Sequence, residues 1–292
     1  MTSIGPWKRL RRFVLWAIRR RITKLTRVSH HGFSLLIDSR DYIIGRSLYT
    51  GREWEPFVSS LFSLMDLAGT VAIDVGANIG IHTVELAMAV GAAGRVIAFE
   101  PESRSFDLLV RNLSRNGVVN TSVEKIALGN HSGRGRLAVH ASNLGDHRIL
   151  REAESTSEPF QDVQIATLDD FCLPLGPNAV SLIKIDVQGF EGQVLQGAEA
   201  TIDANPDLWL ILEIPSVRSR ALTPAPELVR WLVERGFHGV ELHLDRMIPL
   251  LDPEAYSMLF GNDIHVLFSR NQRRLEDLLH ACREIRLRSS GL

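Results

Sequence analysis

The chain has 292 residues, of which 45% are hydrophobic and 23% charged, and its formal net charge is −1. These values are ordinary for a globular protein, and the length allows one large α/β domain or two small ones. Residues 1–37 hold nine Lys or Arg and no acidic residue, so subtracting these nine from the net charge leaves −10 on the remainder. This distribution argues against a body that coats nucleic acid. The two cysteines, Cys172 and Cys282, exclude a disulfide framework and a CxxC zinc site, and they favour a reducing, cytoplasmic setting.

Residues 6–27 predict a basic amphipathic helix, which forms most of an N-terminal region over residues 1–32. Trp7, Leu10, Val14 and Ile18 recur at spacings of three or four and share one face, although Leu15 and Trp16 interrupt the pattern. Two interpretations stay open. The helix lies in the headgroup region of an anionic membrane, as a peripheral contact at its inner face, or it packs on the domain or on a second subunit. No apolar run reaches the ~18 residues of a membrane span, and no export signal is expected.

Regular alternation of strands and helices begins at residue 71, after an expected strand at 33–37 and a short helix at 55–65. Apolar strands are expected at 71–75, 95–99, 123–128, 181–187, 208–214, 239–244 and 264–269. Helices are expected at 81–90, 103–116, 190–204 and 224–235. This order predicts a doubly wound, mostly parallel seven-stranded sheet within a domain over residues 33–270. The last two strands lack a helix between them, so they are expected to pair antiparallel at an edge.

Two segments fall outside that alternation. Residues 129–168 contain two short apolar stretches around a polar acidic segment, which predicts an inserted hairpin or cap over the sheet. Residues 271–292 are expected to form a C-terminal helix or tail. The insertion and the N-terminal region are therefore where the sequence says least about the shape of a ligand pocket.

Three strand ends carry distinctive chemistry. The first strand runs into residues 74–80 (DVGANIG), where glycines allow a tight turn and a close approach to a ligand. Glu100 ends the second strand, and residues 186–191 (DVQGFE) end the fourth. Ligands of open α/β sheets bind at the carboxyl ends of the strands, so these segments are expected to converge on one cleft. Asp74 would repel a pyrophosphate but suits a cationic ammonium, and Glu100 is placed to accept both hydroxyls of a ribose.

On these motifs the chain resembles the FkbM-type methyltransferases. The matching segments are residues 51–55 (GREWE), 73–80 (IDVGANIG), 98–101 (AFEP), 126–129 (IALG), 167–170 (TLDD) and 183–191 (IKIDVQGFE), with a partial match at 143–148 (NLGDHR). The resemblance spans about residues 35–270. It implies a Rossmann-like methyltransferase fold, S-adenosylmethionine as cofactor, and transfer to a hydroxyl of a sugar, glycan or other small natural product. From the charge distribution, no nucleic-acid partner is expected. The expected cofactor-binding residues are Asp74, Gly76, Ala77, Asn78, Gly80, Glu100 and Ala127.

Methylation of an oxygen requires alignment of the acceptor and often removal of its proton. Asp186, at the end of the fourth strand, is the first candidate for an orienting group or base. Glu191 could orient the substrate, but an acid near a helix start equally complements the helix dipole. Glu213, at the end of the fifth strand, and His147, in the insertion, complete the catalytic candidates. Although Asp186, Glu191 and Glu213 offer oxygen ligands, no His or Cys spacing supports a transition-metal site, so no metal is predicted.

Two other functions stay open at this point. An NAD-type oxidoreductase is disfavoured by Asp74 and by the GxxxG spacing. A non-catalytic module that binds S-adenosylmethionine would keep the same cleft. The sequence does not identify the methyl acceptor, does not decide between oxygen and nitrogen as the methylated atom, and leaves the oligomeric state undetermined.

Overall fold

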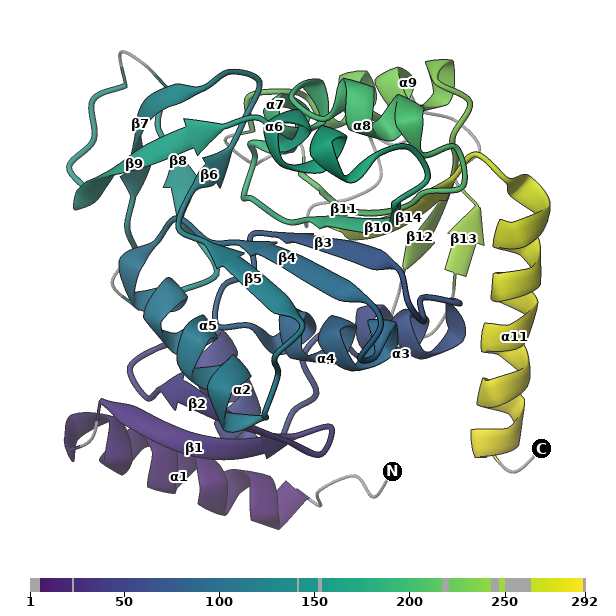
Figure 1. The fold of residues 1–292 in the computed structure, drawn as a ribbon. Helices are drawn as coiled ribbons and strands as arrows, with labels where there is room; N and C mark the ends of the chain where they lie inside the picture. The colour runs from purple at the N-terminus through teal and green to yellow at the C-terminus, as the bar shows by residue number, and fades with distance from the viewer. Residues whose placement is uncertain are drawn as a thin grey trace.

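The structure is a computed structural model that describes residues 6–22, 24–140, 142–151, 154–216, 221–242, 247–249 and 264–290. A sheet of eight strands lies at its centre (Figure 1). The strands, from edge to edge, are β13 (Met247–Pro249), β12 (His238–Leu242), β14 (Ile264–Ser269), β11 (Trp209–Ile214), β10 (Val180–Ile185), β3 (Val71–Val75), β4 (Arg95–Phe99) and β5 (Thr121–Glu124). All seven expected strands are present, and β13 adds a short edge strand. As expected, β14 pairs antiparallel with β12, and it also pairs antiparallel with β11.

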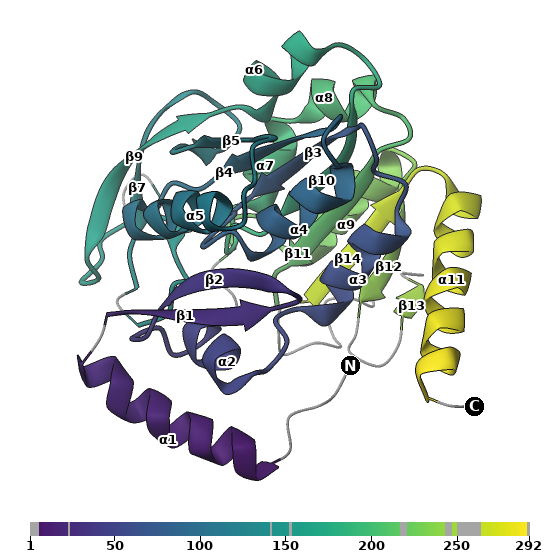
Figure 2. The same ribbon diagram turned by 60° about the horizontal axis from the view of Figure 1, so that its bottom comes forward.

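Helices cover both faces of the sheet, which makes the fold the doubly wound α/β arrangement predicted above (Figures 1 and 2). One face carries α6 (Leu168–Cys172), a 3₁₀ turn (Leu173–Leu175), α7 (Glu191–Gln196), α8 (Glu199–Ala204) and α9 (Ala225–Glu234). The other carries α3 (Pro56–Leu64), α4 (Ile81–Val90), α5 (Ser103–Arg115) and α11 (Gln272–Ser290). Side chains of a strand alternate between the faces. In β10, Ile183 and Ile185 pack toward the first face, while Leu182 packs toward the second.

The single helix expected at 190–204 is wrong, because the structure breaks it into α7 and α8 around Gly197. A Cβ at Gly197 would lie 1.9 Å from the carbonyl oxygen of Gly129, so the break brings the backbone against the start of the insertion. Only a glycine allows this approach.

The insertion forms a second sheet beside the first, which confirms the expected hairpin. Its four strands, in spatial order, are β6 (Ala127–Leu128), β9 (Phe160–Ala166), β7 (Gly133–Ala138) and β8 (Arg148–Ile149). The expected strand 123–128 is therefore split. The chain leaves the main sheet after Glu124, and this departure lets Ile126 and Ala127 line the central cavity.

The N-terminal region differs from the prediction. Helix α1 (Pro6–Ile22) ends before residue 27, and β1 (Leu25–His30) pairs antiparallel with β2 (Phe33–Asp38), so a domain boundary after residue 32 falls inside this hairpin. His31 and Gly32, with φ of 48° and 85°, form its two-residue turn. Asn112 of α5 fastens the hairpin by accepting the Leu36 amide at 2.6 Å. Helix α2 (Ile44–Thr50) follows the hairpin (Figure 2).

One of the two residues that interrupt the apolar stripe of α1, Trp16, anchors the helix on the domain. Trp16 is 2% exposed and meets Tyr42 edge to face, with ring centroids 5.1 Å apart. The stripe itself points away from the domain, since Trp7 is 82% exposed and Leu10, Val14 and Ile18 are about half exposed. Within the described residues, no helix has both the length and the apolarity needed to span a bilayer.

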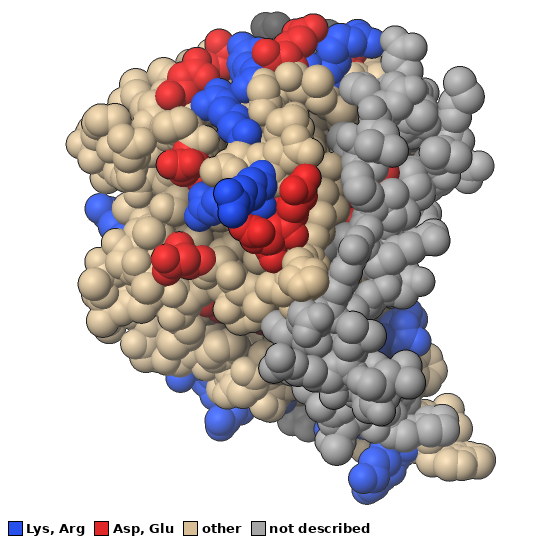
Figure 3. Space-filling model, turned by 90° about the vertical axis from the view of Figure 1, so that its right-hand side faces the viewer, with Lys and Arg blue, Asp and Glu red and all other residues tan. Residues whose placement is uncertain are grey.

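Charge is mixed over the face drawn in Figure 3. Lysine and arginine side chains alternate there with aspartate and glutamate on the part of the surface that the structure describes. Opposite charges also pair directly at the protein surface, for example Arg270 with Asp203 at 2.8 Å. The described part of this face therefore carries no surface of a single sign, in line with the net charge of −1.

Candidate active site

A cavity of about 300 Å³ lies at the carboxyl ends of the parallel strands. Its floor comes from the ends of β3, β4 and β10, and β6 and the insertion close one side. Trp54 and Glu55, just before α3, close another side. The volume lies within the range of small-molecule and cofactor sites. The three strand ends singled out in the sequence therefore do meet at one place, which is the position expected for ligands in such sheets.

The glycine loop between β3 and α4 forms one wall. The amides of Gly76 and Ala77 both donate to the carbonyl oxygen of Phe99, at 3.0 Å. Gly76 has a φ of 80°, and a Cβ there would lie 1.9 Å from the carbonyl oxygen of Asp186. Gly80 has a φ of 84° and does not line the cavity, but it turns the chain into α4. Glycine at 76 thus lets the ends of β3 and β10 approach closely.

Asn78 connects this loop to two other walls. It adopts a left-handed conformation with a φ of 50°, which asparagine tolerates better than most residues. Its amide nitrogen donates to Oε2 of Glu100 at 2.8 Å, and its side-chain Nδ2 donates to the carbonyl oxygen of Leu144 at 2.6 Å. The insertion is therefore held directly over the glycine loop.

Glu100 projects into the cavity while 95% of its surface is buried. Its Oε1 accepts the amide of Glu102 at 2.8 Å and its Oε2 accepts the amide of Asn78. Burial outweighs these two donors and raises the pKa of Glu100 to about 8. Each carboxylate oxygen can accept a second hydrogen bond, so two acceptor positions are available to a ligand with two neighbouring hydroxyls.

Asp74 offers a further unused acceptor. Its Oδ2 accepts the hydroxyl of Thr83 at 2.6 Å, while its buried Oδ1 has no hydrogen-bond partner among the described residues. A buried acceptor without a donor is costly unless a ligand or water supplies one. The cavity thus combines acceptors for a cation and for a diol, and this set of acceptors fits S-adenosylmethionine. Of the seven expected cofactor-binding residues, all except Gly80 line the cavity.

The wall on the other side of β3 from Glu100 is a cluster of charged and amide side chains. Asp186 follows β10, and Glu213 lies in β11. Gln188 joins them, because its Nε2 donates to Oδ1 of Asp186 at 3.0 Å and to Oε2 of Glu213 at 2.6 Å. Lys184, almost fully buried, places its Nζ 3.2 Å from Oδ2 of Asp186.

The charges of this cluster stabilise one another. Burial alone would raise the pKa of Asp186, but the Lys184 ammonium and His265 hold that pKa well below its usual range. Burial would likewise lower the pKa of Lys184, but Asp186, Asp74 and Glu55 raise it overall. The cavity therefore presents an ionised carboxylate at Asp186, backed by a buried cation.

A chain of histidines and carboxylates leads away from this wall. His82 of α4 bonds Glu55 through Nε2 at 2.8 Å and Glu85 through Nδ1 at 3.0 Å. Burial would lower the pKa of His82, but these two carboxylates raise it to about 9. His265 of β14 lies 3.5 Å from Glu55 and 3.9 Å from Asp186.

The sequence interpretation missed Glu55, His82, Lys184 and His265. Of these, Lys184 could have been found from the sequence. It lies two residues before Asp186 in an otherwise apolar strand, so both side chains share one face of that strand. Glu55 and His82 lie at or beside quoted motifs but had no assigned partner. Nothing near His265 in the sequence indicated a role in the site. His265 reaches the site only through the antiparallel register of β14, which places it opposite Glu213.

The other two catalytic candidates are Glu191 and His147. Glu191 is 1% exposed, is absent from the cavity wall, and accepts the amides of Val187 and Gly189 through Oε1, both at 3.1 Å. Its place at the start of α7 corresponds to the structural alternative weighed above. His147 does line the cavity, on the side of the insertion, where its Nε2 lies 3.9 Å from Glu102. Burial lowers the pKa of His147.

Comparison with known proteins places this geometry in a family. The family model described as the methyltransferase FkbM domain matches residues 74–238, more than half of the chain. The methyltransferase sdnD of Sordaria araneosa is 26% identical over 50% of this chain and 67% of its own length. The hexuronic acid methyltransferase AglP of Haloferax volcanii is 28% identical over 42% of this chain and about half (48%) of its own length. Among solved structures, a SAM-dependent O-methyltransferase from Thermotoga maritima has a TM-score of 0.40 and 14% identity, covering 74% of this chain and 64% of that one.

Proposed function

The chain belongs to the methyltransferase FkbM domain family, and we propose that it methylates a hydroxyl group of a sugar, a glycan or another small natural product. Membership makes the protein an S-adenosylmethionine-dependent methyltransferase and replaces the oxidoreductase alternative. The observation that carries the finer proposal is the position of Asp186. It is an ionised carboxylate on the other side of β3 from Glu100, and both line one cavity.

On the cofactor side, we assign binding to Asp74, Gly76, Ala77, Asn78, Glu100 and Ala127, with Gly80 shaping the loop. When bound, S-adenosylmethionine supplies a methyl group activated by a sulfonium. Glu100 would accept the two ribose hydroxyls at its free acceptor positions, and Asp74 would accept the ammonium. Both roles follow from acceptors that the protein itself leaves available in the cavity.

On the acceptor side, Asp186 would accept a hydrogen bond from the attacking hydroxyl and so orient its oxygen. On methylation the acceptor oxygen would lose its proton, and Asp186 would accept that proton or pass it to water. Gln188 fixes the carboxylates of Asp186 and Glu213 relative to each other. The Lys184 ammonium limits the basicity of Asp186, so its part in catalysis rests more on orientation than on proton affinity.

The acceptor class rests on the chemistry of the wall and on the relatives. Carboxylates and an amide are groups that bind sugar hydroxyls, and AglP is named for a hexuronic acid substrate. Incubation with methyl-labelled S-adenosylmethionine and a panel of hexuronic acids, neutral sugars and glycan extracts tests the proposal. A labelled product stable to alkali is the expected methyl ether. An alkali-labile ester would instead place the methyl on a carboxyl group. Cofactor binding without turnover on any acceptor would support the non-catalytic alternative.

We also propose that α1 holds the protein at an anionic lipid surface. The apolar stripe of Trp7, Leu10, Val14 and Ile18 faces away from the domain, since Trp16 makes the inward contact. Lys8, Arg11 and Arg12 are exposed on the same helix. A helix with an exposed apolar stripe and flanking cations suits the headgroup region of an anionic bilayer. Such a location would bring the active site near lipid-linked glycans.

A further inference from the structure

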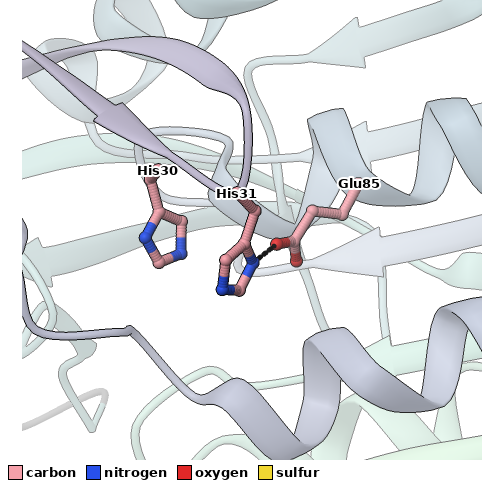
Figure 4. A group of neighbouring side chains, drawn as sticks. All are labelled: His30, His31 and Glu85. Carbon is pink, nitrogen blue, oxygen red and sulfur yellow. Dashed lines mark hydrogen bonds and ion pairs between the residues drawn. The ribbon is translucent and has the colours of Figure 1, made fainter. Parts of the chain in front are cut away.

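A second cluster of ligand-type side chains lies outside the cavity, between the N-terminal hairpin and α4. His30 ends β1, His31 begins the turn, and Glu85 projects from α4 (Figure 4). Consecutive residues of a strand normally point to opposite sides. Here the positive φ of His31 turns its ring onto that of His30, and the two rings stack with centroids 4.0 Å apart. Figure 4 shows the Glu85 carboxylate directed at His31, whose Nδ1 it meets at 2.7 Å.

One atom of this cluster is unexplained by the protein alone. His30 is 6% exposed, and its buried Nε2 has no hydrogen-bond partner among the described residues. In Figure 4 the ring of His30 faces that of His31. Buried ring nitrogens are almost always hydrogen-bonded or bound to a metal, because an unsatisfied one loses its hydration without compensation. The cluster therefore contains a buried ring nitrogen, Nε2 of His30, that can bind a metal ion and lies near two other side chains with metal-binding atoms.

We propose that His30, His31 and Glu85 form a binding site for a divalent transition-metal ion of the Zn²⁺ type. Each residue offers one ligand atom, and the three atoms lie within 4.8 Å of one another. Two imidazoles and one carboxylate are a ligand set that zinc uses in proteins. In tetrahedral coordination such atoms lie about 3.3 Å apart, so shifts of about 1 Å bring them to the ion. The proton that now joins His31 to Glu85 is released to water.

The surroundings of the cluster already orient the carboxylate. The second oxygen of Glu85 accepts the hydroxyl of Ser59 at 2.8 Å and faces Nδ1 of His82 at 3.0 Å. Outer partners of this kind fix ligating carboxylates in metal sites. Ser59 belongs to α3 and His82 to α4, so the support comes from the methyltransferase domain, whereas both histidines come from the hairpin.

The ion would join the hairpin to the domain rather than take part in methyl transfer. None of the three ligands lines the cavity. Hydrogen bonds connect the proposed metal ligands to the cavity: Glu85 bonds His82, and His82 bonds Glu55. Both His82 and Glu55 line the cavity. With three protein ligands, one coordination position is left for water, and His31 is partly exposed. The site is thus a structural clamp beside the active site.

A Co²⁺ titration of the full chain, after metal removal with a chelator, tests the proposal without any methyl acceptor. Wild-type protein is expected to bind one equivalent and to develop the visible absorption of tetrahedral Co²⁺, which Zn²⁺ then removes. His30→Gln and Glu85→Gln should lose this signal while circular dichroism shows a folded chain. Ser59→Ala should weaken binding about tenfold, since it removes only an outer partner.

The matched control is His265→Gln. His265, Glu55 and Asp186 also bring ligand atoms within 4.8 Å of one another, and they form the only other such group in the described residues. The proposal requires His265→Gln to bind Co²⁺ like the wild type. Loss of binding in His265→Gln with retention in His30→Gln would move the ion to the cavity and overturn the proposal. Absence of stoichiometric binding in the wild type would reduce the cluster to a hydrogen-bonded pair.

Discussion

Lys184 and Asp186 lie two residues apart at the end of β10, project from the same face of the strand and form an ion pair of 3.2 Å. Lys184 is 2% exposed, and its strand neighbour across the sheet is Asp74. The buried Lys184 cation therefore contacts the Asp186 carboxylate on one side and lies beside Asp74 of the cofactor wall on the other. The first two predictions separate its effect on stability from the effect of Asp186 on methyl transfer.

Asp186→Asn should lower the rate of methyl transfer by about 10²–10⁴, the range typical of a lost acid–base or orienting group. The dissociation constant of S-adenosylmethionine should change little, because the Asp186 carboxylate lies on the other side of β3 from Glu100 and the substitution keeps the backbone against Gly76. Single-turnover rates with labelled cofactor give the first quantity and calorimetry gives the second. Equal losses in both would assign Asp186 to the cofactor, and loss of neither would remove it from the site.

Lys184→Met should destabilise the fold by about 3–5 kcal/mol, because it leaves buried carboxylates without their cation. Urea unfolding measures this change. The double variant Lys184→Met/Asp186→Asn should recover part of the loss, since one of the unpaired charges is then removed. If the double variant is as unstable as the sum of the single variants, the two side chains do not interact.

Cofactor affinity should rise with pH through Glu100. In the free protein its pKa is about 8, so the carboxyl group is largely protonated at pH 6. Ribose hydroxyls donate to the ionised form, so binding should release a proton and tighten about tenfold or more between pH 6 and 8, with a plateau above. Glu100→Gln should bind weakly at every pH and lose this slope. The exposed Glu234→Gln is the control, and a slope that survives in Glu100→Gln would assign it to another group.

The raised pKa of Glu191 predicts that the folded protein becomes less stable as the pH rises. Burial, opposed by backbone amides, raises its pKa to about 7, above the unfolded value of 4.5. Between these two values the folded state binds more protons, so stability falls as pH rises from about 4.5 to 7 and the loss is complete above 7. Glu191→Gln should match the wild type near pH 4.5 and exceed it by about 1–3 kcal/mol at pH 8. Thermal unfolding across pH measures this difference, and retained methyl transfer would exclude a substrate-orienting role.

The parts of this fold that follow from local pattern could be predicted from the sequence. Apolar strands such as 71–75 and 95–99 are short and bounded by glycine or acidic residues, so their carboxyl ends could be located. Because parallel strands end at one edge, the meeting of Asp74, Glu100 and Asp186 followed from their order alone.

The parts that depend on long-range register could not. The helix expected to reach residue 27 concealed the strand β1 from Leu25 onward, whose partner β2 follows a turn. The contact between His31 and Glu85 joins residues 54 positions apart, so no ligand spacing appears in the sequence. The spacing of the α1 stripe left its burial open, and it did not single out Trp16 as the side chain that packs on the domain. In each case the local sequence was compatible with more than one structure, and contacts with distant parts of the chain determined which one formed.

The exposed stripe of α1 gives the last prediction, and it concerns membranes. Full-length protein should co-sediment with vesicles containing phosphatidylserine at low salt and much less with neutral vesicles, because each basic residue near an anionic surface contributes about 1 kcal/mol. Trp7→Ala/Val14→Asp should abolish binding, since these residues are 82% and 49% exposed and their loss leaves the Trp16 anchor in place. Val233→Asp, on the exposed side of α9, is the matched control and should bind normally. If the stripe variant and the wild type both remain in the supernatant, the membrane role is wrong. If light scattering then shows that only the wild type dimerises, the stripe is an interface between two copies of the chain.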